Sequence, residues 1–205
     1  SDGVLQVAAL QVGSSASRAA WQEAGSTVDP SATPDGSMWF HSGEQVRKTR
    51  DAGQSHPQPQ VICSFTGVAT NATTMTELGK CTIPAAMVRT GDRFEIRYDV
   101  SHEGSAMAFS VAVWWAGTVL VAHSAPATDS SFSGRADALP QGTSVFWSSQ
   151  NWTSAGTPFA VNGLAAGIPA GPVEVRLDGQ MSSPTADTVT LRNLAIVRIP
   201  AQQNP

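Results

Sequence analysis

The strongest constraint on the fold is a strict alternation of apolar and charged residues in RFEIRYDV, residues 93–100. Four apolar side chains alternate with four charged ones, namely Phe94, Ile96, Tyr98 and Val100 with Arg93, Glu95, Arg97 and Asp99. Successive side chains of a strand point to opposite faces, so this segment is expected to be a strand with one buried and one wet face.

Further segments typical of strands recur along the chain, and turns rather than helical patterns join them. They cover residues 61–65, 78–84, 107–115, 118–125, 144–152, 158–163, 172–181 and 187–200. Ala116-Gly117 predicts a tight turn between two of them, and a loss of phase near Asn193 predicts a bulge. Eight or nine short strands predict an all-β protein, an antiparallel jelly-roll-like β-sandwich.

The first part of the chain differs from the rest. Residues 1–57 are rich in Gly, Ser and Pro with brief apolar runs, and Pro57 and Pro59 favour an extended linker. We therefore predict an N-terminal attachment segment over residues 1–57 and a sandwich head over residues 58–205. In the segment 29–53, Gly43 is expected to turn a small hairpin, which neighbouring chains would stabilise.

Charge and composition exclude several classes of protein. The formal net charge is -4 and the isoelectric point about 5.4, whereas a nucleic-acid binder needs a basic face. No apolar run approaches the roughly 20 residues that span a bilayer, and the start lacks the basic and apolar regions of a secretion signal. Four scattered histidines indicate no metal site, and no cofactor is expected.

The two cysteines, Cys63 and Cys81, lie 18 residues apart in two expected strands. A disulfide between neighbouring strands and a pair of half-buried free thiols both fit this spacing. The sequence reasoning favours free thiols in a reducing compartment.

No catalytic motif is present. The chain has no GxSxG elbow, no HExxH and no glycine-rich phosphate loop. Glu95, Asp99 and Glu103 are the candidates for the pair of catalytic carboxylates that glycoside cleavage needs. The first two share the wet face of one strand with arginines, so a charge-compensated surface is the better interpretation, and the protein is predicted not to be an enzyme.

The tryptophans are the best candidates for binding residues. Trp114 and Trp115 are adjacent in one strand, so only one can face the core; Trp115 is assigned to a subunit interface. In the run 147–156, Trp147 and Trp152 flank amide and hydroxyl groups, an arrangement that suits a saccharide. The predicted saccharide contacts are Trp147, Gln150, Asn151 and Trp152, and the alternative is a loop that plugs the end of the sandwich.

A basic cluster follows the aromatic pair Trp39-Phe40. Arg47, Lys48 and Arg50 lie within four residues, and we expect them, with the aromatic pair, to attach the chain to other proteins. The alternative is a solvated hairpin.

Two parts of the chain resemble tailed-phage appendage proteins. Residues 76–100, TELGKCTIPAAMVRTGDRFEIRYDV, resemble the opening of their jelly-roll domains, in which a strand ends in IPA and GD precedes the next strand. Here these residues are Ile83, Pro84, Ala85, Gly91 and Asp92. Residues 186–200 are similar to the last strand of those domains, and residues 34–53 are similar to a short stem unit of fibres and spikes.

The resemblance implies a structural, non-enzymatic virion protein of a tailed phage or gene-transfer-agent-like particle, assembled in the host cytoplasm. It implies a homotrimer that is attached to tail or capsid proteins and carries its head outward, toward host surface polysaccharide. Residues 1–28 show neither heptads nor β-helical repeats, which favours a short spike or decoration protein over a long fibre. The alternatives are a free-standing lectin-like carbohydrate-binding module and, less favoured, a capsule-degrading enzyme.

Overall fold

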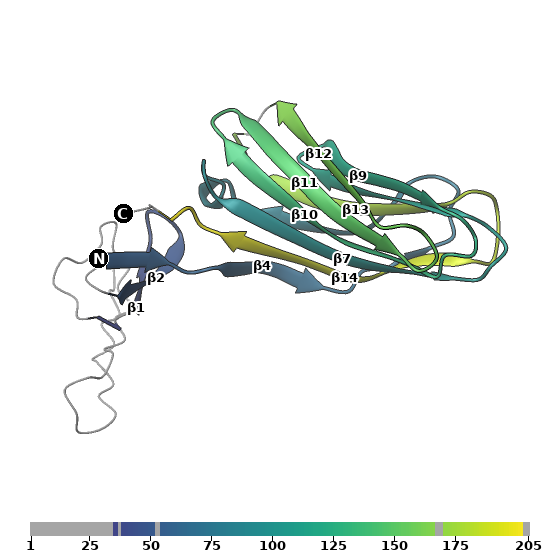
Figure 1. Ribbon diagram of the computed structural model, residues 1–205, viewed down its shortest axis with the longest axis horizontal. Coiled ribbons are helices and arrows are strands. Elements are labelled where there is room, and N and C mark those ends of the chain that lie inside the picture. The colour runs from purple at the N-terminus through teal and green to yellow at the C-terminus, as the bar shows by residue number, and fades with distance from the viewer. Residues whose placement is uncertain (1–34, 37, 52–53, 167–169, 203–205) are drawn as a thin grey trace, which may run out of the picture. The chain divides into compact units, whose positions relative to one another are not determined.

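The protein is an all-β structure built from antiparallel sheets (Figure 1). The computed structural model describes residues 35–36, 38–51, 54–166 and 170–202. The chain divides into two compact units, Ser1–Gln60 with Pro200–Pro205, and Val61–Ile199. Of the predicted attachment segment, residues 1–34 lie outside the described part.

The first unit contains a three-stranded antiparallel sheet in the order β1-β2-β3. Its strands are β1 (Met38–His41), β2 (Val46–Asp51) and β3 (Gln54–Pro57). β1 and β2 form the predicted hairpin, and the loop that joins them contains Gly43. The third strand was not predicted; Pro57 is its last residue, and a proline without an N–H is tolerated at the end of an edge strand.

The second unit is a sandwich of two sheets. Its strands are β4 (Gln60–Phe65), β5 (Ala69–Thr70), β6 (Thr76–Ile83), β7 (Arg93–Glu103), β8 (Phe109–Trp115), β9 (Thr118–Ala125), β10 (Ser131–Gln141), β11 (Ser144–Thr153), β12 (Phe159–Ala166), β13 (Val173–Met181) and β14 (Thr188–Ile199). The larger sheet has the order β12-β11-β10-β7-β14-β4, with β5 beside β14, and the smaller has the order β6-β13-β8-β9.

The strand order is that of a jelly roll with one addition. Two four-stranded layers, β4-β14-β7-β10 and β6-β13-β8-β9, give the eight strands of a jelly roll. β11 and β12 follow β10 and extend the larger sheet beyond this frame, as the side-by-side strands in Figure 1 show.

The core lies between the two sheets and confirms the alternation in β7. Phe94, Ile96, Tyr98 and Val100 are all buried there. From the opposite sheet, the ring of Trp115 packs at a tilt on that of Phe94, with 5.2 Å between ring centroids.

Two local predictions are confirmed as well. Ala116 and Gly117 both have positive φ angles, 48° and 81°, and join β8 to β9 as a two-residue turn. The register of β14 shifts between Leu191 and Asn193, which places a bulge at the predicted position.

The sequence prediction missed β10, and the short β5 as well. β10 pairs with β7 on one side and β11 on the other, so it is central to the larger sheet. Its inward residues after Phe132 are Gly134, Ala136 and Ala138. These small residues alternate with outward polar ones, as in a strand, but they are too weakly hydrophobic for the sequence pattern to indicate a strand.

Cys63 and Cys81 form a disulfide, so the prediction of free thiols was wrong. Their Cα atoms are 6.5 Å apart. The bridge joins β4, at the edge of the larger sheet, to β6, at the edge of the smaller one. Sequence spacing could not show that these two edges face each other across the core.

The GD motif before β7 has a clear structural role. Gly91 has a φ angle of 89°, which favours glycine. Asp92 is buried and accepts a 2.7 Å hydrogen bond from Nε of Arg198 in β14, which is buried too. This pair holds the start of β7 beside the end of β14.

Candidate functional site

The outer face of the larger sheet, the face turned away from the smaller sheet, carries most of its polar groups. Register aligns these side chains in three rows across the strands. The tryptophan row is Asn193, Asp99, Ser133 and Trp152; the arginine row is Arg97, Arg135, Gln150 and Ala160; the carboxylate row is Glu95, Asp137, Ser148 and Asn162.

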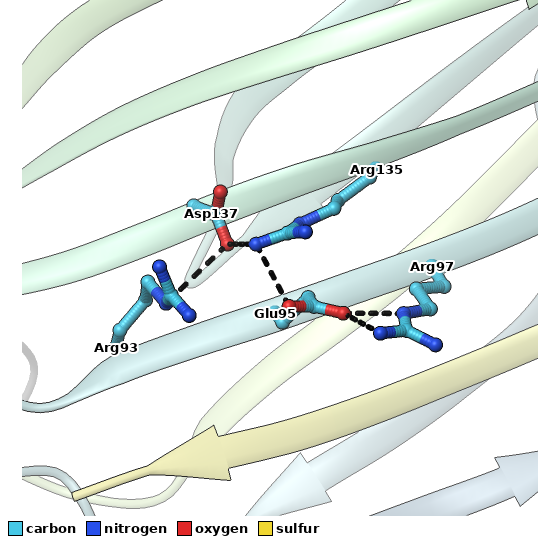
Figure 2. Close-up of polar contacts among 5 residues, drawn as sticks. All are labelled: Arg93, Glu95, Arg97, Arg135 and Asp137. Atoms are coloured by element: carbon cyan, nitrogen blue, oxygen red, sulfur yellow. Dashed lines mark hydrogen bonds and ion pairs between the residues drawn. The ribbon is translucent and has the colours of Figure 1, made fainter.

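Charges of opposite sign alternate through the two middle strands of this face (Figure 2). Glu95 forms ion pairs with Arg97 and, at 2.8 Å, with Nη2 of Arg135. The same Nη2 lies 3.2 Å from Oδ1 of Asp137, which is 3.9 Å from Nε of Arg93. Glu95 is only 4% exposed because the guanidinium groups cover it. The predicted charge compensation is present, but this carboxylate is covered rather than solvated.

Two open depressions adjoin this network. The larger, about 460 Å³, lies over the tryptophan and arginine rows and is lined by Arg97, Asp99, Ser133, Arg135, Trp152 and Asn193, with Tyr98 and Gly134 at its floor. The smaller, about 290 Å³, lies over β10, β11 and β12 and is lined by Arg135, Asp137, Ser148, Ser149, Gln150, Ala160, Val161 and Asn162. Arg135 belongs to both.

The four predicted saccharide contacts do not lie together. Trp152, 45% exposed, and Gln150 project from the outer face of β11. Trp147 and Asn151 have the opposite parity and face the core. Only Gln150 and Trp152 therefore line the depressions, one in each.

The two inward residues have structural roles. The ring of Trp147 lies over Gly163 of β12, where a Cβ atom would come within 2.8 Å of Cζ2. Asn151 accepts a hydrogen bond from the hydroxyl of Tyr98 and donates one of 3.0 Å to Oγ of Ser149. Burial raises the pKa of Tyr98 above its ordinary value, so the hydroxyl keeps its proton.

The adjacent tryptophans of β8 face opposite sides of the sheet, as expected, but the one in the core is Trp115 rather than Trp114. Trp115 is 1% exposed and lies in the core, so its assignment to an interface was wrong. Trp114 faces outward beneath the guanidinium of Arg176, 5.1 Å from the ring centroid. The sequence carried a signal: Phe109, Val111 and Val113 share the parity of Trp115.

The predicted attachment residues of the first unit are split between two faces. Trp39 and Lys48 are paired across β1 and β2 and are both buried, 3% and 5% exposed. Lys48 Nζ lies 2.9 Å from Glu44. Phe40 and Arg47 are paired on the other face, while Arg50 follows the parity of Lys48. The basic residues therefore do not form one patch.

Sequence reasoning also missed residues that shape the loops. The carboxylate of Asp187 accepts hydrogen bonds from the N–H groups of Ala106 and Met107, at 2.7 and 2.9 Å. The N–H of Met107 contributes most to lowering the pKa of Asp187, against a rise from burial. His102 is buried as well, with Nδ1 2.9 Å from the carbonyl of Asp129.

The depressions of the outer face are lined in part by residues that the sequence analysis did not select, namely Arg135, Asp137 and Asn162. They come from β10 and β12, and only the register with β11 brings them together. Within the described ranges, no group of three His, Cys, Asp or Glu residues could hold a metal ion. The same ranges contain no helix long and apolar enough to cross a membrane.

No protein-family model and no curated protein sequence matches this chain. Solved structures similar to it include the insecticidal delta-endotoxin Cry8Ea1 of Bacillus thuringiensis, with 12% identity and a TM-score of 0.34 over 65% of this chain and 20% of the toxin. The structure of infectious bursal disease virus, Gx strain, has 14% identity and a TM-score of 0.34 over 77% of this chain and 35% of the viral chain. The chain thus spans about a fifth and about a third of these two chains. Such TM-scores assign it neither family nor activity.

Proposed function

We propose that this chain is a non-enzymatic structural protein of a tailed phage or phage-like particle, and that its sandwich unit binds saccharides of the host surface. The first unit attaches the chain to other virion proteins, and the assembled form is a homotrimer. The observation that supports saccharide binding is the exposed indole of Trp152 beside an open depression lined by hydrogen-bonding groups.

The chemistry of this depression suits a sugar ring. An exposed indole packs against the C–H face of a pyranose, and it gains both apolar burial and an interaction with the ring face. Around it, Asp99 offers acceptor oxygens while Arg97 and Ser133 offer donors. Sugar hydroxyl groups both donate and accept, so they can pair with this mixture.

The carboxylates of the same face support a binding role rather than hydrolysis. Glu95 and Asp137 are held by arginines, Asp99 accepts a 3.2 Å hydrogen bond from Asn193, and Glu103 is paired with Arg192. A general acid or base must exchange a proton with the substrate, and these carboxylates are already engaged with arginines or with Asn193.

A glycan array with the purified full-length protein tests the binding role. Trp152→Ala is expected to weaken binding at least about tenfold, because it removes the stacking surface and its apolar area. Met75→Ala is the control, since Met75 is exposed to a similar degree, 41%, and lies outside both depressions. Equal binding by the wild type and Trp152→Ala, or release of reducing ends from host capsule, would contradict the proposal.

The virion role is tested separately by mass spectrometry of purified particles. The chain is expected among the particle proteins, and light scattering of the isolated protein is expected to give the mass of a trimer. If the chain bound saccharides but was absent from particles, it would be a free-standing lectin-like module instead.

A further inference from the structure

We infer that the outer face takes an internal stretch of a neutral oligosaccharide, which runs across the strands from the larger depression, over β14, β7 and β10, to the smaller one, over β10, β11 and β12, with Arg135 at their junction. This inference rests on the proposed saccharide-binding function. It adds the length and charge class of the ligand and a set of contacts on β10 and β12.

Outward residues of β11 line both depressions. Trp152 lines the larger one, and Gln150 and Ser148, at every second position of the strand, line the smaller one. A strand rises about 3.3 Å per residue and its neighbour lies about 4.8 Å away, so the Cα atoms of Trp152 and Asn162 are about 14 Å apart. That separation exceeds one pyranose ring, so a ligand that touches both ends has at least two sugar residues.

Shared lining joins the two depressions into one path. Arg135 lines both, and Gln150 follows directly opposite it in register. Their volumes, about 460 and about 290 Å³, lie within or near the range of about 300–1,000 Å³ typical of ligand sites. Both are open to solvent rather than enclosed, so neither has to bury the end of a sugar chain.

The charges of this face favour a neutral ligand. Three arginines, Arg93, Arg97 and Arg135, stand among three carboxylates, Glu95, Asp99 and Asp137. In the ion pairs described above, the arginines and carboxylates already neutralise much of each other's charge. An acidic sugar therefore gains little net attraction and lies close to Asp99 or Asp137, whereas uncharged hydroxyl groups can use donors and acceptors alike.

The hairpin of β11 and β12, which extends the larger sheet, determines where the two depressions lie. The eight-stranded jelly roll would end its larger sheet at β10, and β11 and β12 supply Trp152 and most of the lining of the smaller depression. On β12, Ala160 is small and Asn162 is polar and exposed, so this side of the smaller depression is low beside Gln150 and offers amide groups beside Ser148. On the other side of β11, Arg135 and Asp137 of β10 lie opposite Gln150 and Ser148.

Calorimetry with a size series tests the inference. The probes are neutral gluco-, galacto- and manno-oligosaccharides from mono- to hexasaccharide, with oligogalacturonic acids as the acidic set. Affinity for a neutral series that binds is expected to rise about tenfold or more from mono- to trisaccharide, because further hydrogen bonds form in the smaller depression. Raising NaCl from about 50 mM to about 500 mM is expected to change this affinity less than about twofold.

Two variants locate the second depression. Asn162→Ala removes an exposed side chain and is expected to weaken the binding of longer oligosaccharides about fivefold, without changing the weak binding of the monosaccharide. Arg135→Gln is expected to weaken every length, and Asn162→Ala keeps the test valid if Arg135→Gln fails to fold. Met75→Ala again serves as the control.

The outcomes separate the two proposals. Equal affinity for mono- and hexasaccharides, no effect of Asn162→Ala, or a preference for the acidic set overturns the inference but leaves saccharide binding intact. Failure of every saccharide to bind the wild type overturns the proposed binding function itself.

Discussion

The disulfide between Cys63 and Cys81 is expected to contribute about 3 kcal/mol to the free energy of unfolding. It closes a loop of 18 residues, and the loss of chain entropy in the unfolded state for such a loop is about 3 kcal/mol at 25 °C. For a protein of this size the expected fall in Tm on losing the disulfide is about 6–12 °C.

Guanidinium unfolding of the wild type and of the double variant Cys63→Ala/Cys81→Ala measures this contribution, with tryptophan fluorescence as the signal. Reduction of the wild type should lower its stability to that of the variant, and the variant should not respond to the reductant. A loss below about 1 kcal/mol would refute the chain-entropy reasoning. Two reactive thiols in the oxidised wild type would refute the bridge itself.

Three further predictions concern single residues. Gly134→Ala should lower the free energy of unfolding by about 1–3 kcal/mol, because its Cβ would lie 2.6 Å from both the Tyr98 hydroxyl and Oδ1 of Asn151; urea unfolding measures it. Ala116→Asn should raise stability by about 0.5–1 kcal/mol in the same assay, since asparagine tolerates the positive φ angle of 48°. The pKa of Asp187 is lowered by folding from 3.8, so its stabilisation is complete above that pH and is lost as the pH falls through the folded value. Wild type and Asp187→Asn should therefore differ in Tm at neutral pH and converge as the pH falls below the folded pKa of Asp187; a constant difference would contradict this.

Local features of the fold could be predicted from the sequence because each depends on a few neighbouring residues. The alternation in β7 sets which side chains are buried, and Ala116-Gly117 is sufficient to specify a turn. The bulge in β14 shows as a change of phase near Asn193. These signals need no knowledge of which strands are neighbours.

The features that were missed depend on contacts far apart in the sequence. Arg97 and Arg135 lie opposite each other only because β7 pairs with β10. The sequence did not predict β10, because its inward residues are small. Trp147 and Trp152 are five residues apart in one strand and so face opposite sides, but which of them faces outward depends on which face of β11 meets the smaller sheet. Lys48 is an exception, since it is buried beside Glu44, which lies only four residues away.

The arginine row has a consequence for how this protein can change over evolution. Arg97 and Arg135 are directly opposed like charges, and Glu95 between them is what makes the arrangement favourable. Losing Glu95 leaves two repelling cations, and losing either arginine leaves a covered carboxylate with half its compensation. Substitutions at these three positions should therefore be inherited together, so that related sequences vary at them as a set rather than one at a time.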